Sequence, residues 1–133
     1  MKRTPLKRKT RLSPVSKKRR GMARARKETR ELVLERDMNR CQANIHGCSY
    51  HATDVHEIKS RARGGNIIAI DGDLSNFLSL CRSCHSYITT HPEFSQRNGF
   101  SVGAYCTPAE LRAAERARAI FNSSVEIYEV DDE

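Results

Sequence analysis

Residues 80–85 read Leu80-Cys81-Arg82-Ser83-Cys84-His85, so a Cys-x2-Cys pair is followed at once by a histidine. This spacing places both sulfur atoms on one turn of the chain, and four such ligands from two segments form a tetrahedral zinc site. Cys41 and Cys48 supply a second, wider pair. The sequence therefore predicts a structural Zn²⁺ held by four thiolates. The alternatives are that these are buried free cysteines, or that His46 or His51 replaces one of them as a ligand.

The size and composition of the chain agree with a metal-stabilised domain. With 133 residues, 6% aromatic residues and no Trp, the expected core is thin, and small domains of this kind usually need a metal or disulfides. Five cysteines in a reducing compartment favour metal binding and leave Cys106 as a free or core cysteine. Neither a membrane span nor a secretory signal is recognisable, so we expect a soluble, cytoplasmic protein. The aromatic core candidates are Phe77, Phe94, Phe100 and Phe121.

Positive charge is concentrated at the N-terminus. Residues 1–30 contain 14 of the 24 Lys and Arg residues but only one of the 16 acidic residues, Glu28. Residues 1–21 are also rich in like charge and poor in apolar residues, which predicts a disordered basic arm. Such an arm binds nucleic acid through counterion release, although a solubilising tail is the plainer alternative. The arm residues expected to contact nucleic acid are Lys17, Lys18, Arg19 and Arg20.

The remaining pattern predicts a small α+β domain with short elements. Residues 22–38 should form a helix that docks on the zinc region through Leu32, Val33 and Met38. The sequence Thr107-Pro108-Ala109-Glu110 is typical of a helix start, with a cap, a first-turn proline and a glutamate three residues on. The other expected elements are a knuckle loop at 41–51, strands at 52–59 and 78–80, a hairpin excursion at 66–73, and helices at 82–89, near 92–99 and from 107 to about 121.

A family resemblance rests on three parts of this pattern. Val55-His56-Glu57-Ile58-Lys59-Ser60-Arg61-Ala62-Arg63-Gly64-Gly65, then Asn76, then residues 80–85 resemble the HNH endonucleases, especially the zinc-stapled forms of bacteriophages and bacteria. The resemblance implies a two-stranded antiparallel hairpin followed by a helix, the His-Me finger, with one catalytic divalent ion between them. The resemblance covers roughly residues 28–100. Together with the charge pattern, it suggests a disordered basic arm (1–21), a nuclease domain with its leading helix (22–104), and a C-terminal helix with an acidic tail (105–133).

The resemblance also assigns roles to individual residues. It implies that His85 and His56 ligate a catalytic Mg²⁺, Mn²⁺, Ni²⁺ or Zn²⁺, and that Asn76 binds this ion or holds the general base. The family's usual base is a histidine at the position of Glu57, so Glu57 is the expected base here, and exchanged roles for His56 and Glu57 are the alternative. Adjacent strand residues point to opposite faces, so both reach one cleft only through a twist or bulge. Arg61, Arg63 and Arg82 flank the expected cleft and are natural phosphate contacts.

The expected function is metal-dependent hydrolysis of DNA phosphodiester bonds. The resemblance suggests a phage-encoded protein that acts in the host cytoplasm beside DNA-packaging (terminase) proteins. Two other functions compete with it: a non-catalytic zinc module that only binds nucleic acid, and a protein–protein adaptor that uses residues 107–133. His91 lies six residues after His85, off its helical face, and is not a first-choice ligand.

Overall fold

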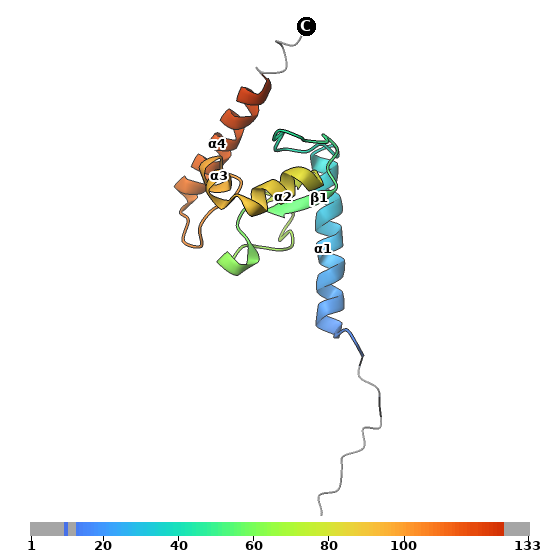
Figure 1. Cartoon of the computed structure of the whole chain (residues 1–133). Helices are drawn as coiled ribbons and strands as arrows, with labels where there is room; N and C mark the ends of the chain where they lie inside the picture. Colours follow the sequence, from blue (N-terminus) through green and yellow to red (C-terminus); the bar gives the residue numbers. More distant parts are fainter. Residues whose placement is uncertain (1–9, 11–12, 127–133) are drawn as a thin grey trace, which may run out of the picture.

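The computed structural model describes residue 10 and residues 13–126, and in this part the chain forms a small α+β domain (Figure 1). A two-stranded antiparallel sheet lies between a long N-terminal helix and a shorter helix that follows the second strand. The expected acidic tail beyond residue 126 and most of the expected basic arm lie outside the described residues. The elements are α1 (Lys17–Arg36), β1 (Asp54–Glu57), η1 (Arg61–Arg63), β2 (Phe77–Leu80), α2 (Arg82–Thr90), α3 (Pro92–Arg97) and α4 (Pro108–Glu126).

The register of the hairpin sorts its side chains onto two faces. Asp54 pairs with Leu80, and His56 pairs with Leu78, so these four residues share one face because strand side chains alternate. Val55 and Glu57 start from the other face, opposite Ser79 and Phe77. Helix α2 covers the face of Asp54 and His56, because His85 contacts both residues. Helix α1 covers the opposite face, where the buried Ser79 hydroxyl donates to the Val33 carbonyl.

Helix α1 begins earlier than the sequence predicts. Ser16 caps it by accepting a hydrogen bond from the Arg19 amide, so residues 17–21 are helical and do not belong to a disordered arm. The helix docks on the hairpin through Thr29 and Val33, which are buried. The docking predicted for Leu32 and Met38 is wrong, since their exposed fractions are 46% and 70%. Leu32 lies about 100° around the helix from Val33, on the other side of Thr29, and Met38 follows the end of the helix with a positive φ of 53°.

The core lies between α2, the cysteine loop and the aromatic residues after α3. Leu80, Ile88 and Phe100 are fully or almost fully buried, and Phe94 and Phe121 pack against this cluster. The predicted cap of α4 is confirmed, because the Thr107 amide donates to the Glu110 carboxylate and the Glu110 amide donates to the Thr107 hydroxyl. The predicted hairpin excursion at 66–73 is instead a loop with a single bridge between Ile70 and Asp73.

No helix in the described part of the chain combines the length and the apolar character needed to cross a membrane.

Candidate functional site

Four cysteine side chains converge where the loop after α1 meets the start of α2. Their Sγ atoms all lie within 4.8 Å of one another, and Cys41, Cys81 and Cys84 are buried while Cys48 is half-buried. Cys81 is the N-cap of α2, and its sulfur accepts a hydrogen bond from the Cys84 amide. The group is positioned to bind a metal ion such as Zn²⁺, as the sequence predicts. His46 and His51 are exposed and lie outside this group, as does Cys106.

The thiols influence one another's protonation. The hydrogen bond from Cys84 lowers the pKa of Cys41 to about 4, and the same contact raises the pKa of Cys84, which acts as the donor. Burial raises the pKa of Cys48 to about 11. One thiolate is thus stabilised by protonated neighbours, and a soft divalent cation suits such a site because its binding displaces the remaining protons.

Helix α2 carries His85 directly after this cysteine cluster. The His85 Nδ1 atom lies 2.9 Å from the Asp54 Oδ2 atom, and the Arg82 guanidinium lies 3.2 Å from the same oxygen. Burial alone would raise the pKa of Asp54, but the His85 hydrogen bond and the Arg82 charge outweigh it and hold the pKa below its usual value. An ionised carboxylate can only accept, so Nδ1 carries the proton and Nε2 of neutral His85 keeps its lone pair. This is the carboxylate–histidine arrangement that orients a metal-ligating imidazole.

His56 lies beside His85, with ring centroids 5.5 Å apart and planes at 70°. Its Nε2 atom is 2.6 Å from the Phe100 carbonyl oxygen, which can only accept, so Nε2 donates and Nδ1 keeps the lone pair. Burial lowers the pKa of His56, and the nearby charge of Arg118 lowers it further. The two histidines that the sequence singled out are therefore neighbours, and each presents one unprotonated nitrogen when neutral.

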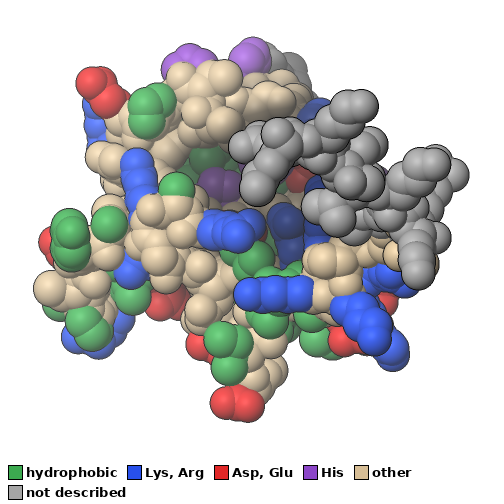
Figure 2. Space-filling view, turned by 90° about the horizontal axis from the view of Figure 1, so that it is seen from below, with side chains coloured by type: hydrophobic (Ala, Val, Ile, Leu, Met, Phe, Trp, Pro, Cys, Tyr) green, Lys and Arg blue, Asp and Glu red, His purple; other side chains and the backbone are tan. Residues whose placement is uncertain are grey.

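Glu57 reaches the same region from the other face of β1. Because β1 is an edge strand, a groove of about 460 Å³ runs along it and collects side chains from both faces of the hairpin. Asp54, Glu57 and His85 line this groove, and His56 is not among its lining residues. Figure 2 shows one face of the molecule, where a histidine side chain lies in a hollow with Lys and Arg side chains nearby. The other lining residues are Arg26, Lys27, Thr29, Arg30, Thr53, Val55, Ile67, Phe77 and Arg82.

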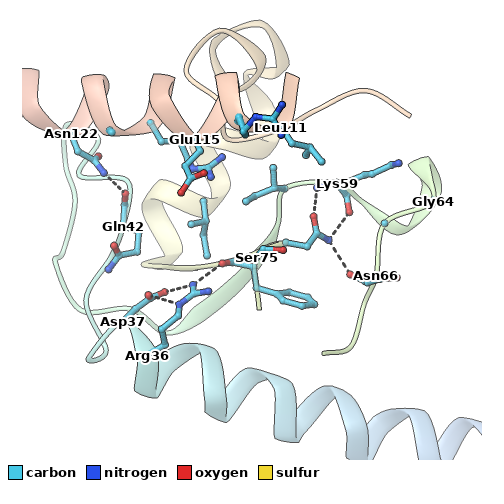
Figure 3. A pocket seen from close by; sticks show the side chains of 18 residues that line it. Arg36, Asp37, Gln42, Lys59, Gly64, Asn66, Ser75, Leu111, Glu115 and Asn122 are labelled. Atoms are coloured by element: carbon cyan, nitrogen blue, oxygen red, sulfur yellow. Dashed lines mark hydrogen bonds and ion pairs between the residues drawn. The ribbon is translucent and has the colours of Figure 1, made fainter. Parts of the chain in front are cut away.

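Asn76 holds the loop that follows β1. Its side-chain oxygen accepts from the Lys59 amide at 2.8 Å, and its nitrogen donates to the carbonyls of Lys59 and Asn66 at 3.0 Å each. Asn76 thus fixes the chain just after Glu57 and Ile58. It lines a different cavity, of about 680 Å³, between β2, this loop and α4, where Figure 3 shows Lys59 and Asn66 around the amide. Although larger, this cavity contains neither His56 nor His85, so the groove along β1 is the better candidate site.

The remaining predicted site residues are the three arginines expected to contact phosphate and His91, and only Arg82 among them lines the groove. Arg82 lines it, whereas Arg63 donates to the Val102 carbonyl and belongs with Arg61 to η1, outside the groove lining. His91 is stacked on Tyr87 with ring centroids 3.9 Å apart and does not line the groove.

The charged groove residues that the sequence reasoning missed include Asp54, Arg26 and Arg30. Asp54 lies two positions before His56, and strand alternation alone would have placed both on one face. Arg26 and Arg30 share one face of α1 at a spacing of four residues, but only the packing of α1 on the hairpin brings them to the groove.

Comparison of the chain with protein-family models, with curated proteins and with solved structures finds no match.

Proposed function

We propose that the protein is a metal-dependent endonuclease that hydrolyses DNA phosphodiester bonds at the groove along β1. The observation that carries the proposal is the Asp54–His85 hydrogen bond, which engages the Nδ1 atom of His85 and leaves its Nε2 atom as the possible metal-binding nitrogen in a groove lined by arginines. A histidine oriented by a carboxylate is typical of metal ligation, and arginines are suited to phosphate oxygens.

The donor atoms available in the groove suit a hard, partly hydrated cation. His85 supplies an imidazole nitrogen and Glu57 a carboxylate, while the Asp54 carboxylate is engaged by His85 Nδ1 and Arg82 and orients the ring. Among the residues that the structure describes, the four cysteines are the one group in which three or more ligand atoms converge. A cation in the groove would then be held by few protein ligands, with water and phosphate oxygens completing its shell, as Mg²⁺ and Mn²⁺ commonly are. When bound, such a cation would polarise the scissile phosphate and acidify water.

The proton acceptor for the attacking water is proposed to be Glu57. Glu57 lines the same groove as His85, and a carboxylate beside a bound cation is able to accept the proton of an attacking water. His56 lies outside the groove lining, beside His85, with an unprotonated Nδ1 atom. It is assigned to metal ligation or to support of His85. With the roles exchanged, His56 would accept the proton and Glu57 would bind the cation.

Plasmid nicking tests the proposal. Zinc-loaded protein should nick supercoiled DNA when Mg²⁺, Mn²⁺ or Ni²⁺ is added, and His85→Ala should abolish nicking while zinc content and thermal unfolding stay unchanged. His91→Ala is the matched control, since His91 is an exposed histidine on the same α2–α3 segment outside the groove. Full activity of His85→Ala, or no nicking by the wild type with any of these metals, refutes the proposal.

The base assignment needs its own variant. Glu57→Gln keeps the size of the side chain and its ability to accept hydrogen bonds but removes the basic carboxylate. Loss of a general base typically costs 10²–10⁴-fold in rate. A near-normal nicking rate for Glu57→Gln excludes Glu57 as the base and moves that role to His56.

A non-catalytic nucleic-acid-binding zinc module is the second candidate function. The observation that favours it is the converged cysteine cluster, since the groove has no comparable set of three converged ligand atoms among the described residues. A closed four-thiolate site is structural and leaves no open position for chemistry. DNA binding without nicking under all metals would support this function over the nuclease.

A further inference from the structure

Three of the nine basic residues of α1 lie along one side of the helix. Arg19, Arg26 and Arg30 occur at spacings of seven and four residues. At about 100° per residue, these spacings place the three side chains within about 40° of one another. We call these three residues the arginine face of α1.

The acidic residues of α1 lie on a different side. Glu28, Glu31 and Glu35 point about 150° away, on average, from the arginine face. Two of them pair with basic neighbours, Arg24 with Glu28 at 3.1 Å and Lys27 with Glu31 at 3.9 Å. Within the described residues, Arg19 and Arg26 form no ion pair. One side of the helix is thus largely neutralised, and the arginine face keeps its positive charge.

The arginine face leads into the candidate site. Arg26 and Arg30 line the groove with Asp54, Glu57 and His85. Arg30 also donates to the Thr53 carbonyl at 2.6 Å, which fixes it beside the start of β1. Figure 1 shows that the N-terminal half of α1 projects away from the body of the domain, so the face continues outward from the groove.

The length of the arginine face sets the size of the ligand. Arg30 lies eleven positions after Arg19 in the helix, and a rise of 1.5 Å per residue gives roughly 16 Å. At about 3.4 Å per step along one strand, this length corresponds to about five base pairs. We infer that α1 is a docking helix for the phosphate backbone of a nucleic-acid duplex, which its arginine face holds over about five base pairs to one side of the groove.

This inference rests on the proposed function, which places a phosphodiester in the groove. Charge complementarity selects the ligand, because the face presents only guanidinium groups, which bind phosphate oxygens in pairs of hydrogen bonds. Such contacts position a duplex without reading its sequence.

The salt dependence of duplex binding tests the inference. Affinity of the full zinc-loaded chain for a 20-base-pair duplex is measured over a range of salt concentrations without added divalent cation. Each phosphate contact contributes about 0.9 to the slope of log K against log salt. The variant Arg19→Gln/Arg26→Gln should therefore lower the slope by about 1.8. Lys17 was predicted to contact nucleic acid as part of a disordered arm, but it belongs to α1 and lies about 160° around the helix from Arg19. The matched control Lys17→Gln/Arg24→Gln therefore removes the same charge from the acidic side of the helix and should lower the slope much less.

The possible outcomes test the docking role of α1 and the proposed nuclease activity independently. Equal slope changes in both double variants would overturn the inference, because net charge and not the arginine face would then drive binding. Absence of duplex binding, or stronger arginine-face-dependent binding to vesicles of anionic lipid than to the duplex, would overturn it as well. The expected difference in slope supports it even if the wild type fails to nick DNA, and nicking with equal slopes leaves the proposed function intact.

Discussion

Replacement of Asp54 by asparagine tests the orientation of His85 most selectively. Asp54 is the residue that both His85 and Arg82 contact, at 2.9 Å and 3.2 Å, and its side chain is only 11% exposed. Asparagine has nearly the same shape but no charge, so the Asp54→Asn variant should keep the fold and lose the charge-assisted hydrogen bond to His85.

The expected magnitude follows from the position of Asp54 behind the proposed ligand. Removal of a partner that orients a metal-ligating histidine typically costs 10–100-fold in metal affinity or activity. This corresponds to about 1.4–2.7 kcal/mol. If Asp54 orients His85 and is not itself a ligand, a higher metal concentration should restore much of the lost activity.

The assay is the nicking rate as a function of Mn²⁺ concentration. Asp54→Asn should shift the half-maximal Mn²⁺ concentration upward by 10–100-fold. Asp73→Asn is the control, because Asp73 is an exposed aspartate whose hydrogen bond to the Ser75 amide lies outside the groove. An unchanged Mn²⁺ dependence in Asp54→Asn, with normal zinc content, would refute the role given to the Asp54–His85 pair.

Three further predictions concern stability. Cys84→Ser should lose bound zinc and unfold at a lower temperature, measured by elemental analysis and calorimetry; full zinc content would contradict the four-thiolate site. Asn76→Ala removes three hydrogen bonds to the loop after β1 and should cost about 2–4 kcal/mol in urea unfolding, whereas no loss would disprove its loop-closing role. Burial alone would raise the pKa of Asp37, but the hydrogen bonds from Arg36 and Ser79 outweigh it and lower the pKa. The free energy of unfolding of the wild type should therefore exceed that of Asp37→Asn by a constant amount above about pH 4–5, and this difference should disappear as the pH falls through the lowered pKa. A difference that stays constant down to about pH 2 would contradict the prediction.

Local spacing in the sequence was enough to predict the elements around the site. The Cys-x2-Cys pair, the strand at Leu78–Leu80 and the helix after it follow from short-range patterns, and the structure has all three. The start of α1 was missed because the dense positive charge of residues 17–21 resembles a disordered segment, while the Ser16 cap supports a helix.

Long-range packing explains what the sequence could not predict. The contact of His85 with Asp54 joins α2 to β1, and no local spacing encodes it. Metal binding and support of the base were the two roles expected for Asn76. Its hydrogen bonds to Lys59 and Asn66 depend on the path of the loop in three dimensions, which the sequence does not reveal. A twist or bulge was expected to bring both His56 and Glu57 to one cleft, but of the two only Glu57 lines the groove, and the regular register keeps them on opposite faces of β1.

Anomalous diffraction from crystals soaked in Mn²⁺ is the most direct measurement of the central claim. We predict an Mn²⁺ peak in the groove along β1, at coordination distance from the His85 Nε2 atom and distinct from the zinc at the four cysteines. Mn²⁺ bound away from His85, or no Mn²⁺ in the groove of zinc-loaded protein, would contradict the claim that His85 and Asp54 form a catalytic metal site.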